Sequence, residues 1–388
     1  MDILYVFNPE NDLALASGLV NYTAPKNARK IRNDLQMLPL WIASEGDSLL
    51  VENNISNLSF LKEVQESFWD LSTISIWNKN RKLQAVKPWG WSASIWHELQ
   101  RLHLYLPNYR LPDFARIREL AHRKLTIQVH GWICDNYSNF TLPVAPVLCS
   151  SFAEVEKTVC KLGTSILKAP WSSSGRGIVR ADRDNITGLK SWCEGIIQKQ
   201  GSVVCEKMLE KIQDFAMEFY SDGSSVNFKG YSVFYNNAQF SYDTALVASE
   251  EMLEQKISSF IDREDLLTVR EMMEVCLTHY IAPAYIGDLG VDMMIYNDSG
   301  KSRIMPIVEV NLRTTMGMVA AVLGNKIVEK GKMGKMSILF HKNPDIAKEY
   351  LSAIKKSVIK NGRLVAGGLS LVPQYSDSQY TAVVEILG

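Results

Sequence analysis

The chain has 388 residues, with 42 basic and 42 acidic side chains and a hydrophobic content of 46%. This length exceeds what one hydrophobic core usually supports, so we expect two or three packed units. The balanced charge argues against nucleic acid or an anionic membrane surface as a partner. The six cysteines form no Cys-x-x-Cys pair, and the apolar start is too short for a signal sequence or a membrane span. We therefore expect free thiols in a cytoplasmic protein.

Residues 1–115 alternate strand-like and helix-like segments, which is typical of an α/β domain. The expected strands are residues 3–7, 48–51 and 72–77, and the expected helices are residues 28–38 and 92–104. The first strand is followed by the polar loop Asn8, Pro9, Glu10, Asn11 and Asp12. Open α/β sheets bind ligands at loops of this kind, so these side chains either contribute to a substrate pocket or only cap the strand.

Residues 116–250 contain a second set of helices and strands. One helix, at residues 116–128, is expected to lead out of the first domain, and a second, at residues 151–162, is expected to be capped by Ser150. The expected strands are short and β-rich: residues 165–168, 178–180, 203–205, 215–220, 230–235 and 239–242. Those after residue 200 are typical of an antiparallel sheet.

The loop between the first two of these strands is rich in small residues. Lys168 ends the first strand, and residues 172–177 read Ser-Ser-Ser-Gly-Arg-Gly. Small residues let backbone N–H groups approach phosphate oxygens, and Lys168 and Arg176 add positive charge. The loop therefore indicates a phosphate site, with a solvated hairpin turn as the alternative.

A second polar segment follows the strand at residues 203–205. Glu206 is placed to accept a hydrogen bond from an adenine amino group, and the main chain of the next three residues can face a purine edge. Asp214 is placed to bind ribose hydroxyls. An ordinary strand with solvated ends is the alternative reading.

The last third of the chain is expected to begin with two helices within residues 249–280, broken near Asp262. Strands at residues 290–296 and 303–310 follow, and the turn signal Asn-Asp-Ser-Gly at residues 297–300 joins them. An amphipathic helix at residues 344–360 and a hairpin of residues 364–372 and 380–387 complete the chain.

Carboxylates on the paired strands indicate a metal site. Alternation places Glu309, Asn311 and Arg313 on one face, and Asp292 interrupts an otherwise apolar strand. Mg²⁺ prefers such oxygen ligands, and a buried unpaired carboxylate is costly. A cross-strand ion pair with an arginine is the alternative. A tight hairpin would set Glu309 opposite Asp288, so Asp288 is the rival ligand unless the connection is bulged.

Taken together and in order, these elements resemble the ATP-grasp superfamily over roughly residues 116–320. The resemblance implies an N-terminal α/β domain, the pre-ATP-grasp domain, at residues 1–115. A two-lobed ATP-grasp fold of the α+β class is implied after it. The small lobe, with the glycine-rich loop, is expected at residues 116–205, and the large lobe, with the metal site, at residues 206–388.

The resemblance also implies a set of site residues. The implied nucleotide contacts are Lys124, Lys168, Ser173, Ser174, Gly175, Gly177, Glu206, Lys207, Met208, Leu209 and Asp214. The implied metal ligands are Asp292, Glu309 and Asn311, and the implied catalytic residues are Arg313, Lys168 and Arg176. The implied cofactors are ATP and Mg²⁺, with Mn²⁺ as an alternative metal.

The implied reaction is an ATP-dependent ligation. A carboxylate is activated as an acyl phosphate, which an amine or another nucleophile then attacks. The expected partners are small-molecule carboxylates and amines, and a homodimer is compatible with the resemblance. A kinase that phosphorylates a small molecule is one alternative. A nucleotide-binding regulatory protein without turnover is another, because Gly290 stands where many of these ligases have an arginine.

Overall fold

The computed structural model describes residues 2–52, 54–79, 81–104, 112–138, 140–172, 175, 177–237 and 242–387. Its N-terminal part is a four-stranded parallel sheet in the order β3-β2-β1-β4. The strands are β1 (Ile3–Val6), β2 (Ser48–Leu50), β3 (Ser75–Ile76) and β4 (Ala85–Pro88). The predicted α/β domain is therefore confirmed. The sequence analysis missed β4, because a terminal proline argues against a strand.

Both faces of the first strand are buried, as its continuous apolar run suggests. Leu4 and Val6 belong to a core cluster shared with the helices that precede the small lobe, whereas Tyr5 and Phe7 belong to a second cluster shared with the C-terminal strands. The indole nitrogen of Trp41 donates a hydrogen bond of 2.7 Å to the carbonyl of Leu371. The N-terminal sheet thus packs against the C-terminal strands.

The helices of this part are α1 (Asn11–Ser17), α2 (Lys26–Asp34), α3 (Ile55–Ser67) and α4 (Ala93–Gln100), with the 3-10 turns η1 (Leu38–Trp41) and η2 (Trp69–Leu71). The predicted helix at residues 28–38 ends earlier than expected. Pro39 lacks an N–H group and disfavours helical geometry in the residue before it, so the chain continues as the turn η1.

The predicted helix at residues 116–128 is wrong in one respect, because two helices occupy this segment. They are α5 (Phe114–Leu120) and α6 (Lys124–Asn136). Between them the backbone N–H of Arg123 donates a 3.1 Å hydrogen bond to the carbonyl of Pro170 and not to the preceding turn. This long-range bond sets the break, which the local sequence does not reveal.

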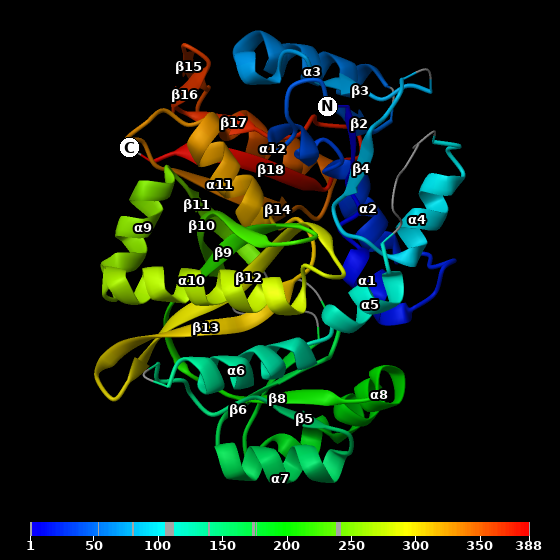
Figure 1. Cartoon of the computed structure of the whole chain (residues 1–388). Helices are drawn as coiled ribbons and strands as arrows, with labels where there is room; N and C mark the ends of the chain where they lie inside the picture. Colours follow the sequence, from blue (N-terminus) through cyan, green and yellow to red (C-terminus); the bar gives the residue numbers. More distant parts are fainter. Residues whose placement is uncertain are drawn as a thin grey trace.

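The small lobe is a four-stranded antiparallel sheet with α7 and α8 packed on it, at the bottom of Figure 1. Its elements are β5 (Val147–Cys149), α7 (Phe152–Leu162), β6 (Ser165–Lys168), β7 (Ile178–Ala181), α8 (Lys190–Gln200) and β8 (Val203–Lys207). The strand β6 has the predicted bounds. Ser151, and not Ser150, caps α7, since its hydroxyl accepts from the N–H of Glu154 at 3.3 Å. The helix α8 was not predicted.

The large lobe is an eight-stranded sheet in the order β13-β12-β9-β10-β11-β14-β18-β17. Its strands are β9 (Glu210–Asp222), β10 (Val226–Asn236), β11 (Tyr242–Val247), β12 (Ile286–Asp298), β13 (Lys301–Asn311), β14 (Gly334–Phe340), β17 (Gly368–Ser370) and β18 (Tyr380–Ile386), beside the small hairpin β15 (Val358–Lys360) and β16 (Arg363–Ala366). The helices are α9 (Glu250–Ser258), α10 (Arg263–Tyr280), α11 (Met316–Lys326) and α12 (Pro344–Ala353). The predicted break near Asp262 is confirmed, because Asp262 caps α10.

The register between β12 and β13 decides which carboxylates face each other. The hairpin closes at Asp298 and Lys301 through two residues with positive φ, which is typical of a tight turn. Met294 pairs with Met305, but Asp292 pairs with Glu309. Residues 306–308 therefore form a bulge opposite a single residue of β12. Pro306 suits this position because it has no N–H group to give to the ladder.

Two tryptophans that follow β4 lie in the core. Trp89 and Trp91 are buried, and the ring of Trp89 packs edge to face against Phe7 at 4.9 Å. The carbonyl of Trp89 accepts a 2.7 Å hydrogen bond from the N–H of Thr314. The end of β4 is thereby joined to the end of β13. In the described ranges, no helix is both long enough and apolar enough to cross a bilayer.

Candidate active site between the lobes

A cavity of about 340 Å³, here called the central cavity, lies between the small and the large lobe. This volume is in the usual range for small-molecule sites. Most of the predicted site residues line it: Lys168, Gly175, Glu206, Lys207, Met208, Leu209, Asp214, Asp292, Glu309, Asn311 and Arg313. Pro9 and Trp89 contribute a wall from the N-terminal domain. Segments far apart in the sequence thus converge on one space.

The glycine-rich loop is described only in part. Ser173, Ser174 and Arg176 lie outside the described residues. Gly177 does not line the central cavity, but its carbonyl accepts a 2.8 Å hydrogen bond from the N–H of Ala169 and so closes the base of the loop. It has a positive φ of 75°, and a Cβ there would lie 3.0 Å from that of Ala169, so a glycine is required.

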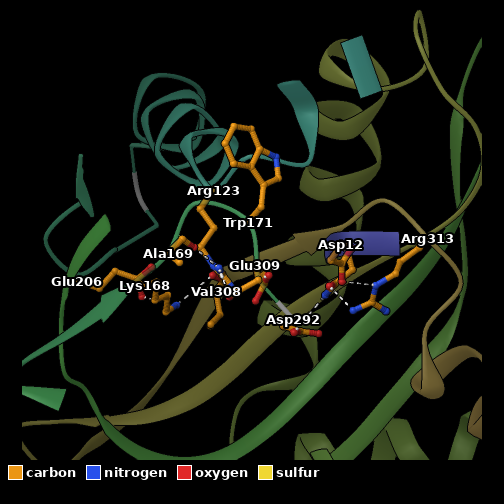
Figure 2. Close-up of polar contacts among 12 residues, drawn as sticks. Asp12, Arg123, Lys168, Ala169, Trp171, Glu206, Asp292, Val308, Glu309 and Arg313 are labelled. Atoms are coloured by element: carbon orange, nitrogen blue, oxygen red, sulfur yellow. Dashed lines mark hydrogen bonds and ion pairs between the residues drawn. The ribbon is translucent and has the colours of Figure 1, made fainter. Parts of the chain in front are cut away.

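Lys168 lies at the end of β6 and is only 5% exposed. Its ammonium group lies 2.6 Å from a carboxylate oxygen of Glu206 and 3.5 Å from the carbonyl of Val308, a residue of the large lobe (Figure 2). The other oxygen of Glu206 is buried without a hydrogen-bond partner among the described residues. The cation of the small lobe therefore points toward the large lobe.

Arg123, and not the predicted Lys124, faces the central cavity. The ammonium group of Lys124 bonds Glu119 at 2.9 Å on the surface, and Lys124 is not among the described residues that line the cavity. Arg123 is 4% exposed. Its guanidinium lies 2.7 Å from Glu309 and also bonds the hydroxyl of Ser172 at 2.7 Å (Figure 2). One arginine thus connects the base of the glycine-rich loop with the strand that carries the acidic residues.

The acidic residues are grouped by the bulge in β13. Asp292 and Glu309 are cross-strand partners, and the side-chain amide of Asn311 donates a 3.2 Å hydrogen bond to Asp292. Burial, together with the charge of Glu309, raises the pKa of Asp292 to about 7. No group of three or more His, Cys, Asp or Glu side chains with metal-site geometry occurs in the described ranges. Two carboxylates and an amide are nevertheless the hard oxygen donors that Mg²⁺ takes when phosphate oxygens complete its shell.

Asp288, the rival ligand, is engaged elsewhere. Lys87 of β4 lies 2.8 Å from its carboxylate, and the hydroxyl of Thr314 donates to it at 2.9 Å. It is not among the described residues that line the central cavity. Asp288 therefore ties the N-terminal sheet to the large lobe.

Arg313 connects the central cavity to the loop after β1. Its guanidinium lies 2.9 Å from the carboxylate of Asp12 and donates to the side-chain oxygen of Asn311 at 3.0 Å. Of the polar loop singled out in the sequence, Asp12 thus reaches the site through Arg313, and Pro9 lines the cavity directly.

Glu218 is a lining residue that the sequence analysis missed. It lies on β9, is 1% exposed, and accepts a 2.8 Å hydrogen bond from the hydroxyl of Thr315. Burial raises its pKa to about 8, so the acid is held neutral at pH 7. The available signal was the same as for Asp292, a carboxylate that interrupts an apolar strand.

Replacing Glu218 by glutamine is expected to flatten the pH dependence of stability. A folded-state pKa above the ordinary value of 4.5 for a glutamate means that the native state holds a proton which the unfolded state releases, so wild-type stability falls as the pH rises from about 4.5 to about 8. The neutral amide has no such dependence. Thermal unfolding midpoints at pH 5 and pH 9 test this, and equal slopes for both proteins would contradict it.

No protein-family model and no curated protein sequence matches the chain. Solved structures do. Biotin carboxylase from Campylobacter jejuni, in a β,γ-ATP complex, has a TM-score of 0.54 at 10% identity, covering 100% of this chain and 87% of that one. N5-carboxyaminoimidazole synthetase from Staphylococcus aureus, complexed with ADP, has a TM-score of 0.51 at 11% identity, covering 100% and 93%. A biotin carboxylase domain from Hydrogenobacter thermophilus, with MgADP and bicarbonate, has a TM-score of 0.52 at 10% identity, covering 100% and 86%. Over its whole length, the chain therefore has the same fold as these solved structures.

Proposed function

We propose that the chain is an ATP-dependent ligase that binds MgATP in the central cavity and activates a carboxylate as an acyl phosphate. One observation carries the proposal: cationic side chains of the small lobe and oxygen ligands of the large lobe face the same cavity. Nucleotide complexes of proteins with this fold, with ADP in one and MgADP in another, support it.

Different residues would bind the base, the ribose and the phosphates of the nucleotide. The segment from Glu206 to Leu209 would contact the adenine, and Asp214, which bonds Lys211 at 2.5 Å and Asn236 at 3.0 Å, would accept from the ribose hydroxyls. Lys168 and Arg123 neutralise the phosphates. Asp292, Glu309 and Asn311 would hold Mg²⁺, which supplies charge neutralisation to the phosphoryl group that is transferred.

The chemistry needs positioning and charge and requires no covalent enzyme intermediate. A carboxylate oxygen of the substrate attacks the γ-phosphorus, the bond from that phosphorus to the β–γ bridging oxygen breaks, and ADP leaves. The second nucleophile then attacks the carbonyl carbon of the acyl phosphate, and phosphate leaves. Arg313 is placed to stabilise the oxyanion that forms at that carbon.

Hydroxylamine trapping tests the reaction class. The enzyme with MgATP is screened against amino acids, dipeptides and hydroxy acids, and ADP release is measured with and without hydroxylamine. A ligase forms a hydroxamate from its carboxylate substrate, because hydroxylamine captures the acyl phosphate. A phosphorylated hydroxyl product without hydroxamate would indicate the kinase, and nucleotide binding without ADP release would indicate a regulatory protein.

Replacing Arg123 by glutamine is expected to weaken MgATP binding about tenfold or more, since a buried charge-assisted contact to phosphate is lost. Lys124→Gln is the matched control, because the neighbouring cation lies on the surface beside Glu119. Isothermal titration with MgATP measures both variants. Equal losses in the two variants, or a loss in Lys124→Gln alone, would restore the assignment made from the sequence.

A further inference from the structure

A second cavity, of about 200 Å³, is lined in part by the segment that follows β1. We call it the switch-point cavity. Asn8, Glu10 and Asn11 line it from the loop, Ser92 and Glu98 from the start and end of α4, and Arg29 from α2. Water in the liquid takes about 30 Å³ per molecule, so the space holds either several waters or one small molecule.

The strand order places this cavity where open α/β sheets bind ligands. After β1 the chain builds outward through β2 and β3, and then returns to add β4 on the opposite side of β1. All of these pairs are parallel, and Val6 is opposite Pro88 at the carboxyl ends of β1 and β4. The order therefore reverses between β1 and β4, and the crevice outside such a reversal is the usual ligand site.

Buried polar atoms of two side chains at this cavity lack hydrogen-bond partners among the described residues. Asn11 is 1% exposed, and neither atom of its amide has a hydrogen-bond partner among the described residues. One carboxylate oxygen of Glu10 is also buried without a hydrogen-bond partner among the described residues, while the other accepts a 3.0 Å hydrogen bond from Arg32. An unpaired buried polar group is unfavourable, and proteins rarely leave one without a purpose.

Packing and not hydrogen bonding holds Asn11 in place. A Cβ at Gly90 would lie 2.4 Å from the amide nitrogen of Asn11, so the amide lies directly against the main chain at the end of β4. Asn8 fixes the same region, because its side chain donates to the carbonyl of Gly90 at 2.8 Å. The amide is thus preorganised and still free to bond a ligand.

The charges of the cavity favour a molecule with both signs. Arg32 lies between Glu10 at 3.0 Å and Glu98 at 2.5 Å, so one cation is shared by two carboxylates and the loop side keeps a negative excess. Burial raises the pKa of Glu10, and Arg32 opposes that rise. An ammonium ligand would oppose it further. Arg29, one turn before Arg32 on α2, is exposed, and its guanidinium forms no hydrogen bond within the described part of the chain.

We propose that the switch-point cavity binds a zwitterionic small molecule, an amino acid or short peptide, with Glu10 and Asn11 accepting from its ammonium group and Arg29 pairing with its carboxylate. The loop after β1 carries acids and amides where a phosphate cradle would need glycine N–H groups, so a phosphorylated substrate does not fit. This inference rests on the proposed function. Pro9 lines the central cavity and Asp12, in the first turn of α1, pairs with Arg313 there, so the segment that binds the zwitterion also borders the proposed MgATP site.

The test is direct binding without nucleotide. Isothermal titration is run with the twenty L-amino acids and a set of dipeptides, with the N-acetylated form of each binding compound, and with ribose 5-phosphate. We expect at least one amino acid or dipeptide to bind, and its N-acetylated form to bind at least about tenfold more weakly. Glu10→Gln and Asn11→Leu are each expected to weaken binding about 10- to 100-fold, as for a charge-assisted hydrogen bond to a buried group. Glu63→Gln, on the exposed face of α3, is the matched control.

Three results would overturn the inference: binding of ribose 5-phosphate in place of the amines, equal binding of the acetylated forms, or no binding by any compound, which would mean that the cavity holds water only. Glu10→Gln preserves the shape of the site, so its result stands even if Asn11→Leu fails to fold. MgATP titration on the same proteins separates the two proposals. If MgATP binds but no amino acid or dipeptide does, only this inference is wrong. If an amino acid or dipeptide binds but MgATP does not, only the proposed function is wrong.

Discussion

Replacing Lys168 by methionine is expected to lower ATP-dependent turnover about 100- to 1000-fold at saturating ATP, the size of effect seen when a preorganised charge-stabilising group is removed. The same change leaves the carboxylate of Glu206 buried without its partner at 2.6 Å. Breaking one side of a buried ion pair costs about 3–5 kcal/mol. The variant should therefore unfold at a lower temperature as well as turn over slowly.

A double variant separates these two effects. Lys168→Met combined with Glu206→Gln removes both charges, and replacement of a buried pair by neutral groups is often close to neutral for stability. We expect the thermal midpoint to recover while turnover stays low. Lys161→Met, on the exposed side of α7, controls for loss of a lysine from the small lobe. Recovery of turnover in the double variant would show that Lys168 acts only on folding.

Replacing Asp292 by asparagine is expected to abolish the Mg²⁺ dependence of ATP binding and to lower turnover about 100-fold or more. In the metal-free protein the same change should raise the thermal midpoint. Burial and the facing carboxylate of Glu309 already raise the pKa of Asp292 to about 7, so the neutral amide removes an unfavourable charge. Loss of function with a gain in stability is the signature expected of a metal ligand.

Asp288→Asn is the matched control for that experiment. Asp288 bonds Lys87 and Thr314, so its replacement should destabilise the protein and leave the response to Mg²⁺ intact. Thermal midpoints and ADP release are measured over a Mg²⁺ titration for both variants. If Asp288→Asn loses the response while Asp292→Asn keeps it, the assignment of the metal ligands is reversed.

Local signals in the sequence predicted the elements that local physics controls. The strand at residues 165–168 has its expected bounds, and Asp262 starts a helix. The turn predicted at residues 297–300 closes one residue later, at Asp298 and Lys301, and has positive φ at two residues of the predicted segment, Ser299 and Gly300. In each case the side chain that decides the geometry acts within a few residues of its own position. The domain boundaries at residues 115 and 205 stay predictions.

Long-range contacts determine the elements and the site residue that the sequence did not predict. Arg123 and Lys124 are adjacent cations, and only contacts with residues distant in the sequence, such as Pro170 and Glu309, distinguish the one that faces the cavity. The helix α11 was missed because it is apolar on nearly every side and shows no helical period. Gly324 in that helix lies so close to Ala248 that a Cβ there would fall 1.9 Å from its carbonyl oxygen. No local pattern carries such information.

The bulge at residues 306–308 determines which residue faces Glu309 across the strands. It adds two residues to one strand, and because side chains alternate with a period of two, an even addition keeps Glu309 on the face that it would have had in a continuous ladder. Deleting two residues of the bulge would leave Glu309 on the same face of the sheet. Its cross-strand partner would then be Gly290, which lies about 7 Å along the strand from Asp292. The spacing of the two acids is therefore governed by strand length, so a sequence can keep every acidic residue and still lose the pair.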